Sequence, residues 1–355
     1  MVEKASKIEV DSNENSGVVV GSNLGSITLG MSYKDVKELC YDIVSYELLN
    51  YKREAEEKAK QRLTIFSEEL IEKLSEKRIT SEKCLEKFKD PSVLNDVFEA
   101  EKSYIKRGTK ELKDLLINVI DKRLEYTEKD NELLNIVLSE AIKVAPKLTN
   151  IQYKILSLGF IFKHVNWTNI LNKDNLVARI ITEILPILNN FETKDSDYQH
   201  LVYTGCGTLS IGSDNLISWF RQYDGIFSNG LEVSELENLK KLYVDCEKLL
   251  QICINDHSKK QFAFINKFDL EERLKQEKID NQTIKKILQI YGKTVPNDND
   301  LETELITMVP KIKFLFDYWK ENKIKNLQMS SVGIVIGAEN LEKELNQKFD
   351  LSIWI

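Results

Sequence analysis

The sequence predicts a mainly α-helical protein with a short N-terminal β-hairpin and a small C-terminal strand–helix–strand unit of winged-helix type. Glycine and proline are scarce, with 14 and 5 residues in 355, whereas sandwiches, barrels and Rossmann sheets need many turns. Good helix formers such as leucine, glutamate, lysine and alanine dominate residues 34–159. Apolar residues there recur at steps of three and four, which is the period of an amphipathic helix.

The composition limits the classes of function. Hydrophobic residues make up 42% and charged residues 30% of the chain, which is typical of a folded protein. The 50 Lys and Arg against 57 Asp and Glu give a net charge of -7, which disfavours a protein whose main surface binds phosphates. The sequence has no run of 18 apolar residues and no signal-peptide pattern. We therefore expect a cytoplasmic protein with no membrane partner.

The five cysteines are expected to be reduced thiols. They are odd in number and form no CxxC pair. Cys246 and Cys253 are seven residues apart, which predicts that they lie on one face of a helix as small buried side chains. The full set is Cys40, Cys84, Cys206, Cys246 and Cys253.

The N-terminal part predicts a polar tail followed by a β-hairpin. Residues 1–16 are expected to be a disordered, solvated tail. Residues 17–30 hold four of the glycines between β-branched and apolar residues, with a polar turn at 22–25. A two-stranded hairpin alone is only marginally stable in water. It must pack on the rest of the chain or on copies of itself.

Residues 17–77 are interpreted as a homo-oligomerisation module, in which a long helix over about 34–77 follows the hairpin. Ser32 is a suitable N-cap for this helix. An apolar face that runs from the hairpin into the helix is difficult for one subunit to bury alone. That face is expected to contain Val18, Val20, Ile27, Leu29, Tyr33, Leu39 and Ile43. A hairpin folded against its own chain remains the alternative.

Residues 78–298 are predicted to form a helical body, and residues 299–355 a C-terminal α/β unit. Helix caps, prolines and apolar periodicity place helices at about 81–88, 91–106, 109–126, 128–145, 151–164, 174–191, 214–223, 233–254, 270–278, 281–291 and 300–322. In the C-terminal unit we expect a strand at 325–330, a helix at 332–346 and a closing strand at 349–355.

A Gly-rich loop, GCGTLSIGS at 205–213, is the candidate site for a nucleotide or small ligand. A glycine loop that runs into a helix N-terminus presents amide N–H groups to an anion, and a helix is predicted to start near its end. The candidate residues are Gly205, Cys206, Gly207, Gly212 and Ser213. No Walker lysine follows and the spacing does not match GxGxxG, so a structural turn is the simpler interpretation.

No catalytic residue, metal site or cofactor is predicted. The three histidines are far apart, and the HExxH and GxSxG motifs are absent. Whether the chain is an enzyme is left open, with a non-enzymatic function favoured. A weaker candidate is a nucleic-acid surface where lysines lie among aromatic residues. Its residues are Lys311, Lys313, Lys320 and Lys323.

Three segments together resemble a known family. They are GSNLGSITLGMSYKDVKELCYDIV (21–44), GCGTLSIGSDNLISWFRQYDGIFSNGL (205–231) and SSVGIVIGAENLEKELNQKFDLSIWI (330–355). Together they are similar to a family of uncharacterised bacterial proteins found near restriction and phage-defence genes. The resemblance implies that the N-terminal module is an assembly element, and it assigns no catalytic residue. Met31 and the Ser330–Ser331 pair depart mildly from the family's pattern.

The sequence therefore predicts a cytoplasmic, self-associating helical scaffold or adaptor. Its expected partners are copies of itself and, from the resemblance, another defence-system protein. Two alternatives remain. One is a nucleic-acid-binding regulator that acts through the C-terminal unit, and the other is a sensor of a nucleotide or small ligand at residues 205–213.

Overall fold

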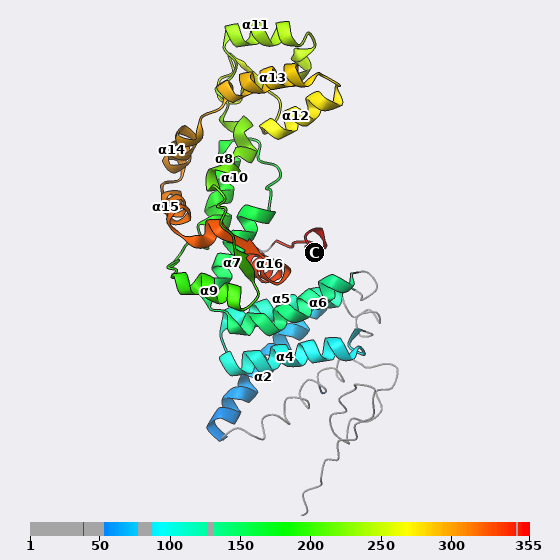
Figure 1. The fold of residues 1–355 in the computed structure, drawn as a ribbon. Helices are drawn as coiled ribbons and strands as arrows, with labels where there is room; N and C mark the ends of the chain where they lie inside the picture. Colours follow the sequence, from blue (N-terminus) through cyan, green and yellow to red (C-terminus); the bar gives the residue numbers. More distant parts are fainter. Residues whose placement is uncertain (1–37, 39–52, 77–86, 127–130, 346) are drawn as a thin grey trace, which may run out of the picture. The chain divides into compact units, whose positions relative to one another are not determined.

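The structure is a computed structural model, and it confirms the mainly α-helical class (Figure 1). It describes residues 38, 53–76, 87–126, 131–345 and 347–355. Among these residues, β structure is confined to two small antiparallel sheets of two strands each. The chain divides into two compact units, residues 1–98 and 99–355. The predicted boundaries near residues 16, 77 and 298 stay predictions.

In the first unit, α2 (Arg53–Glu76) is the described part of the predicted long helix. Its buried apolar residues follow steps of four and three, as a helix face requires; they are Ala59, Leu63, Phe66 and Leu70. The predicted hairpin and its apolar face lie outside the described residues. That face comprises Val18, Val20, Ile27, Leu29, Tyr33, Leu39 and Ile43.

Five helices between residues 91 and 345 match the predicted positions closely. Pro91 occupies the first position of its helix, where its missing N–H group costs nothing. Thr149 and Gln152 form a capping box at the start of α7. The five helices are α4 (Pro91–Arg107), α5 (Lys110–Glu125), α6 (Glu132–Val144), α7 (Asn150–His164) and α16 (Ser331–Leu345).

The centre of the second unit is the packing of α16 against α5, α6 and α7 (Figure 1). The apolar run ILSLGFIF predicts a core helix, and α7 is buried along this run. Two glycines on α16 permit the close approach. A Cβ atom on Gly333 would lie 2.0 Å from the Cys206 carbonyl oxygen, and one on Gly337 would lie 2.5 Å from the Leu156 carbonyl oxygen.

The predicted helix over 174–191 is interrupted. Helix α8 (Lys173–Arg179) continues into a π-helical turn, η2 (Ile180–Ile184), and residues 185–190 form turns. Pro186 lacks the N–H group that a further helical turn needs. The following elements are α9 (Asp195–Tyr203), β1 (Gly207–Leu209), α10 (Leu216–Phe220) and η3 (Arg221–Phe227).

Residues 229–295 fold around a small core of their own, which includes Leu239, Phe262, Leu274 and Tyr291. The elements are α11 (Val233–Leu242), η4 (Cys246–Leu249), β2 (Leu250–Ile252), β3 (Lys260–Phe262), α12 (Lys267–Gln276) and α13 (Asn281–Thr294).

The predicted helix over 233–254 is wrong beyond its first ten residues. It ends at Leu242, and residues 250–252 pair with 260–262 as an antiparallel hairpin. Cys246 and Cys253 are both fully buried, but Cys246 lies in η4 and Cys253 directly after β2, so they share no helix face. Cross-strand pairing and burial against the local core outweigh the local helical pattern here.

The C-terminal part is described by α14 (Asp298–Met308), η5 (Pro310–Ile312), α15 (Lys313–Glu321), η6 (Lys323–Asn326), β4 (Leu327–Met329), α16 and η7 (Leu351–Ile353). Pro310 divides the predicted helix over 300–322, because proline has no N–H group to donate within a helix. The expected strand at 325–330 is β4, which pairs with β1 rather than with the end of the chain.

The predicted closing strand at 349–355 is wrong, and with it the winged-helix arrangement. These residues form an irregular segment with the 3-10 turn η7. The reason is packing on α7, since the rings of Phe349 and Trp354 lie 5.1 and 5.0 Å from the Phe160 ring. The Trp354 indole also donates to the His164 carbonyl oxygen at 3.1 Å.

Candidate functional site

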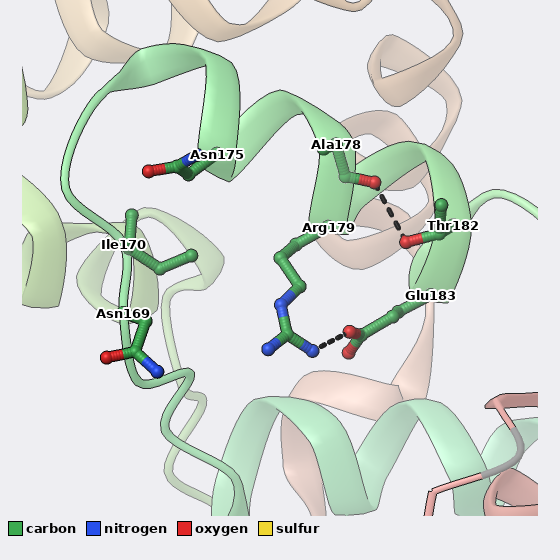
Figure 2. Close-up of a pocket in the computed structure, with 7 residues that line it drawn as sticks. All are labelled: Asn169, Ile170, Asn175, Ala178, Arg179, Thr182 and Glu183. Carbon is green, nitrogen blue, oxygen red and sulfur yellow. Dashed lines mark hydrogen bonds and ion pairs between the residues drawn. The ribbon is translucent and has the colours of Figure 1, made fainter.

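A surface pocket of about 370 Å³ lies beside the π-helical turn η2 (Figure 2). Its walls come from α8, from η2 and from the loop that precedes α8. Most of its side chains are polar or charged, and two are small or branched apolar groups. The lining residues are Asn169, Ile170, Asn175, Ala178, Arg179, Thr182 and Glu183.

Arg179 and Glu183 form the charged wall of this pocket. Leu185 donates its backbone N–H to the Ile180 carbonyl oxygen at 3.0 Å, which is the i to i+5 bond of a π-turn. Such single π-turns occur frequently at functional sites. The Nη1 atom of Arg179 donates to Oε1 of Glu183, as Figure 2 shows. The Glu183 side chain is only 9% exposed, whereas that of Arg179 is 33% exposed.

Three further polar side chains line the pocket, and two of them are amides. Asn169 adopts a left-handed backbone conformation with φ of 63°, which asparagine tolerates better than most residues. The Asn175 side-chain oxygen accepts a hydrogen bond from the Leu171 N–H at 3.2 Å. The Thr182 hydroxyl donates to the Ala178 carbonyl oxygen at 2.9 Å, so its oxygen can still accept a bond.

The pocket therefore presents unused hydrogen-bonding capacity next to an ion pair. Within the part of the chain that the structure describes, Nε and Nη2 of Arg179 and Oε2 of Glu183 have no hydrogen-bond partner. The guanidinium edge formed by Nε and Nη2 is the one that binds a carboxylate side-on with two hydrogen bonds.

A second cluster of charges is enclosed between α5 and α16. Glu339 is fully buried, and neither of its carboxylate oxygens has a hydrogen-bond partner among the described residues. The Lys122 ammonium group lies 3.0 Å from Glu342 Oε1 and donates to the Phe349 carbonyl oxygen at 2.7 Å. Glu342 in turn accepts the Phe349 backbone N–H at 2.5 Å.

Burial is the main reason that the pKa of Glu339 lies well above its usual range. The negative charge of Glu342 raises this pKa further, and the Lys122 ammonium lowers it. For Lys122, burial lowers the pKa, but the charges of Glu339 and Glu342 raise it by more. The cluster holds the C-terminal segment against the helices. Because its side chains are buried or nearly so, we assign it a structural role.

The Gly-rich loop at 205–213 is arranged as a packed strand and turn. The backbone N–H groups of three residues in and next to the loop donate to other carbonyl oxygens, at 2.9 Å in each case; the donors are Cys206, Ser210 and Asp214. A Cβ atom on Gly207 would lie 2.4 Å from the Gln328 carbonyl oxygen. Close β1–β4 packing thus explains this glycine without a ligand.

The other residues predicted for this loop are divided between core and surface. Gly205 has a φ of +79°, and nothing lies within 4 Å of a Cβ atom placed on Gly212. Cys206 is fully buried, and burial raises the pKa of its thiol. Ser213 is exposed. Helix α10 begins only at Leu216 and has five residues. The ligand site proposed for this loop stays a prediction.

The four C-terminal lysines lie on α15 and its flanking turns. Lys313 lies 2.5 Å from Asp317, Lys320 lies 2.5 Å from Glu302, and Lys323 lies 2.8 Å from Asp195. Lys311 is exposed on η5. Because three of the four lysines are next to a carboxylate, this surface has mixed charge. The nucleic-acid surface predicted here also stays a prediction.

The sequence analysis missed the pocket at η2 altogether. Its lining comes from one short stretch, NILNKDNLVARIITE (169–183), in which the only charged side chains at the pocket are four residues apart. Spacing of this kind is common on solvated helices. The informative feature is the π-turn, which periodicity alone does not predict.

Fold and site define a mainly α-helical protein with a polar surface pocket. Among the described residues, no group of His, Cys, Asp and Glu side chains is placed to hold a metal ion. No helix in that part is both long and apolar enough to cross a membrane. The model of an uncharacterised family matches residues 30–355, and the chain belongs to that family. No curated protein and no solved structure matches the chain.

Proposed function

We propose that the protein is a self-associating helical scaffold or adaptor that acts in the cytoplasm in bacterial anti-phage defence. The observation that carries the proposal is the glycine-rich apolar ribbon at residues 17–30, because two short strands cannot be stable alone. The helical body supports it as a platform, since α16 packs against three helices far from it in the sequence. The link to defence, and a second defence-system protein as partner, are supported by the resemblance of the three segments.

Light scattering on the full-length chain tests self-association. We expect a mass that is a multiple of 41.1 kDa, and a monomer for the variant with Val20→Asp and Ile27→Asp, because two buried charges disrupt an apolar interface. Ser12→Asp adds a charge in the predicted tail and should leave the mass unchanged. A chain that begins at Asp35 should also be monomeric. The same number of subunits in all four proteins would exclude the module.

A nucleic-acid-binding regulator is the second candidate, and α13 favours it. The sequence of this helix, NQTIKKILQIYGKT, has no acidic residue. Its exposed side chains are amides and lysines, namely Asn281, Gln282, Lys285, Lys286, Gln289 and Lys293. A four-residue turn with Lys278 in the left-handed conformation (φ 58°) joins it to α12. Two helices joined in this way can present the second helix to a DNA major groove.

Binding of a DNA duplex at several salt concentrations tests this candidate. We expect Lys285→Glu with Lys286→Glu to weaken binding and to lower the slope of log K against log salt by about 2, since each phosphate contact contributes about 0.9. The matched control is Lys320→Glu with Lys323→Glu, which changes charge equally on the C-terminal surface. Loss of binding in the control alone would assign the contact to that surface instead. No binding by the unmodified protein would exclude the candidate.

A further inference from the structure

We propose that the pocket beside η2 binds a small hydroxy acid through its single carboxylate group, with Arg179 as the residue that recognises it. The proposal is independent of self-association and of nucleic-acid binding. It rests on the open edge of the Arg179 guanidinium group, which lies on the side away from Glu183, in a hollow that two amides and a hydroxyl group also line (Figure 2).

The Arg179 guanidinium group has one occupied edge and one open edge. Its Nη1 atom donates to Oε1 of Glu183, whereas Nε and Nη2 have no hydrogen-bond partner among the residues that the structure describes. The N–H bonds of Nε and Nη2 are parallel along the open edge, and this pair of donors matches the two oxygens of a carboxylate. Because the bond to Glu183 already orients the guanidinium group, less side-chain entropy is lost when a ligand binds.

The open edge is within reach of a ligand. The Arg179 side chain is 33% exposed and lines the pocket, whose volume is about 370 Å³. Figure 2 shows this side chain extending from α8 into the space between the helix and the loop that carries Asn169 and Ile170. In this view the bond to Glu183 lies on the side of the guanidinium group away from that loop. A carboxylate at the open edge would therefore lie between Arg179 and Asn169.

The uncharged polar groups of the pocket favour a ligand with hydroxyl groups beside its carboxylate. Asn169 and Asn175 each carry an amide that can donate two hydrogen bonds. The Asn175 oxygen already accepts the Leu171 N–H at 3.2 Å, so its amide nitrogen is the part left for a ligand. The Thr182 hydroxyl donates within the helix and keeps its oxygen as an acceptor. A ligand hydroxyl can accept from an amide and donate to Thr182.

Glu183 limits the negative charge that the ligand can carry. Its side chain is only 9% exposed, so water screens its charge poorly and it repels an anion bound at Arg179. The guanidinium charge offsets one carboxylate. The second negative charge of a phosphate monoester meets no further cation among the residues that line the pocket. The pocket should therefore select carboxylates over phosphates, which is specificity by repulsion of the wrong ligand.

Thermal unfolding of the full-length protein with the sodium salts of lactate, glycerate, threonate and gluconate, at millimolar concentration, is the first test. Sodium chloride at equal ionic strength is the blank. We expect one or more of these acids to raise the melting temperature, since a ligand that binds only the folded state stabilises it. Calorimetry then compares glycerate with glyceramide, which is uncharged, and with glycerol 3-phosphate, which carries the larger charge. Both comparison ligands should bind at least tenfold more weakly.

Substitutions of Arg179 assign the carboxylate-binding group. Arg179→Gln should lower the affinity for glycerate at least tenfold. Arg179→Lys keeps the charge but not the paired donors, so it should also lower the affinity at least tenfold. The matched control is Arg273→Gln, because Arg273 and Glu277 form an equivalent pair four residues apart on α12 at 2.8 Å. This control should bind glycerate as the unmodified protein does.

Substitution of Asn169 tests where the carboxylate lies. Asn169→Asp puts a negative charge on the loop across from Arg179 with little change in volume, and aspartate also tolerates the left-handed conformation. This variant should bind glycerate at least tenfold more weakly. The matched control is Asn190→Asp, because Asn190 is likewise exposed and left-handed, with φ of 51°. It should leave the affinity unchanged.

Three results would overturn the proposal. They are no shift with any of the four acids, equal binding of glyceramide or glycerol 3-phosphate, and undiminished binding by Arg179→Gln. Circular dichroism establishes that each variant is folded. Asn169→Asp, at an exposed position, takes the place of Arg179→Gln if that variant does not fold, and undiminished binding by Asn169→Asp would then overturn the proposal.

Discussion

Replacing the buried carboxyl of Glu339 should stabilise the protein at neutral pH. Glu339 is fully buried and neither oxygen has a hydrogen-bond partner among the described residues. Methionine has a similar volume, is unbranched and is apolar. The control is Glu342→Met on the same helix, because Glu342 lies 3.0 Å from the Lys122 ammonium and accepts the Phe349 N–H. The two substitutions should therefore have opposite signs.

The raised pKa of Glu339 makes the free energy of unfolding depend on pH. The folded state holds this proton more tightly than the unfolded state, whose pKa is near the ordinary 4.5. Stability is thus greatest below pH 4.5 and falls by about 1.4 kcal/mol per pH unit as the pH rises toward the folded pKa. The loss therefore begins above pH 4.5 and stops growing once the pH passes the folded pKa. Removing one partner of a buried ion pair, as in Glu342→Met, costs about 3 kcal/mol.

Urea unfolding followed by circular dichroism at several pH values between 5 and 8 measures both effects. The difference in unfolding free energy between Glu339→Met and the unmodified protein isolates the contribution of this carboxyl. We expect the difference to grow in favour of the variant as the pH rises. A variant that is destabilised at pH 7, or a difference that does not change with pH, would refute the reasoning.

Three further predictions concern packing and thiol reactivity. Gly333→Ala should lower the unfolding free energy by at least about 2 kcal/mol, because the new Cβ would lie 2.0 Å from a backbone oxygen. The control Gly212→Ala should change the unfolding free energy by less than about 0.5 kcal/mol. Thermal unfolding of the two variants measures the difference. Trp354→Ala should cost about 2 kcal/mol through the lost ring contacts with Phe160 and the lost indole hydrogen bond. Cys206 should react with iodoacetamide only after unfolding, because burial raises the pKa of its thiol, and peptide mapping by mass spectrometry would detect modification of the folded protein.

Local signals were sufficient for the helices from residue 91 to 164. Pro91 and Thr149 mark helix starts by chemistry that acts within one turn of the chain. The apolar period also identifies α7 as a core helix. These features need no knowledge of the rest of the fold.

Where the structure departs from the expectation, pairing and packing partners decide it rather than the local pattern. β4 pairs with β1, which is more than a hundred residues earlier in the chain. The segment 349–355 is rich in apolar residues and alternates well enough for a strand, but its rings pack on α7 instead. Likewise, the helix predicted over 233–254 ends because β2 and β3 pair and close a local core. A single sequence does not reveal these partners.

For the candidate sites too, local sequence signals were less informative than the packing partners in the fold. The ligand site predicted at 205–213 stays a prediction, and the structure explains Gly207 by the close approach of Gln328. The pocket was missed because Arg179 and Glu183 are unremarkable as an i, i+4 pair. Their importance comes from the π-turn and from the loop that places Asn169 opposite them.

The mass of the intact assembly is the most direct test of the central claim, that this chain functions by associating with itself. Native mass spectrometry of the full-length protein at micromolar concentration should show a discrete oligomer, with the 41.1 kDa chain as its repeating unit. A single species at the mass of one chain, at every concentration tested, would contradict it.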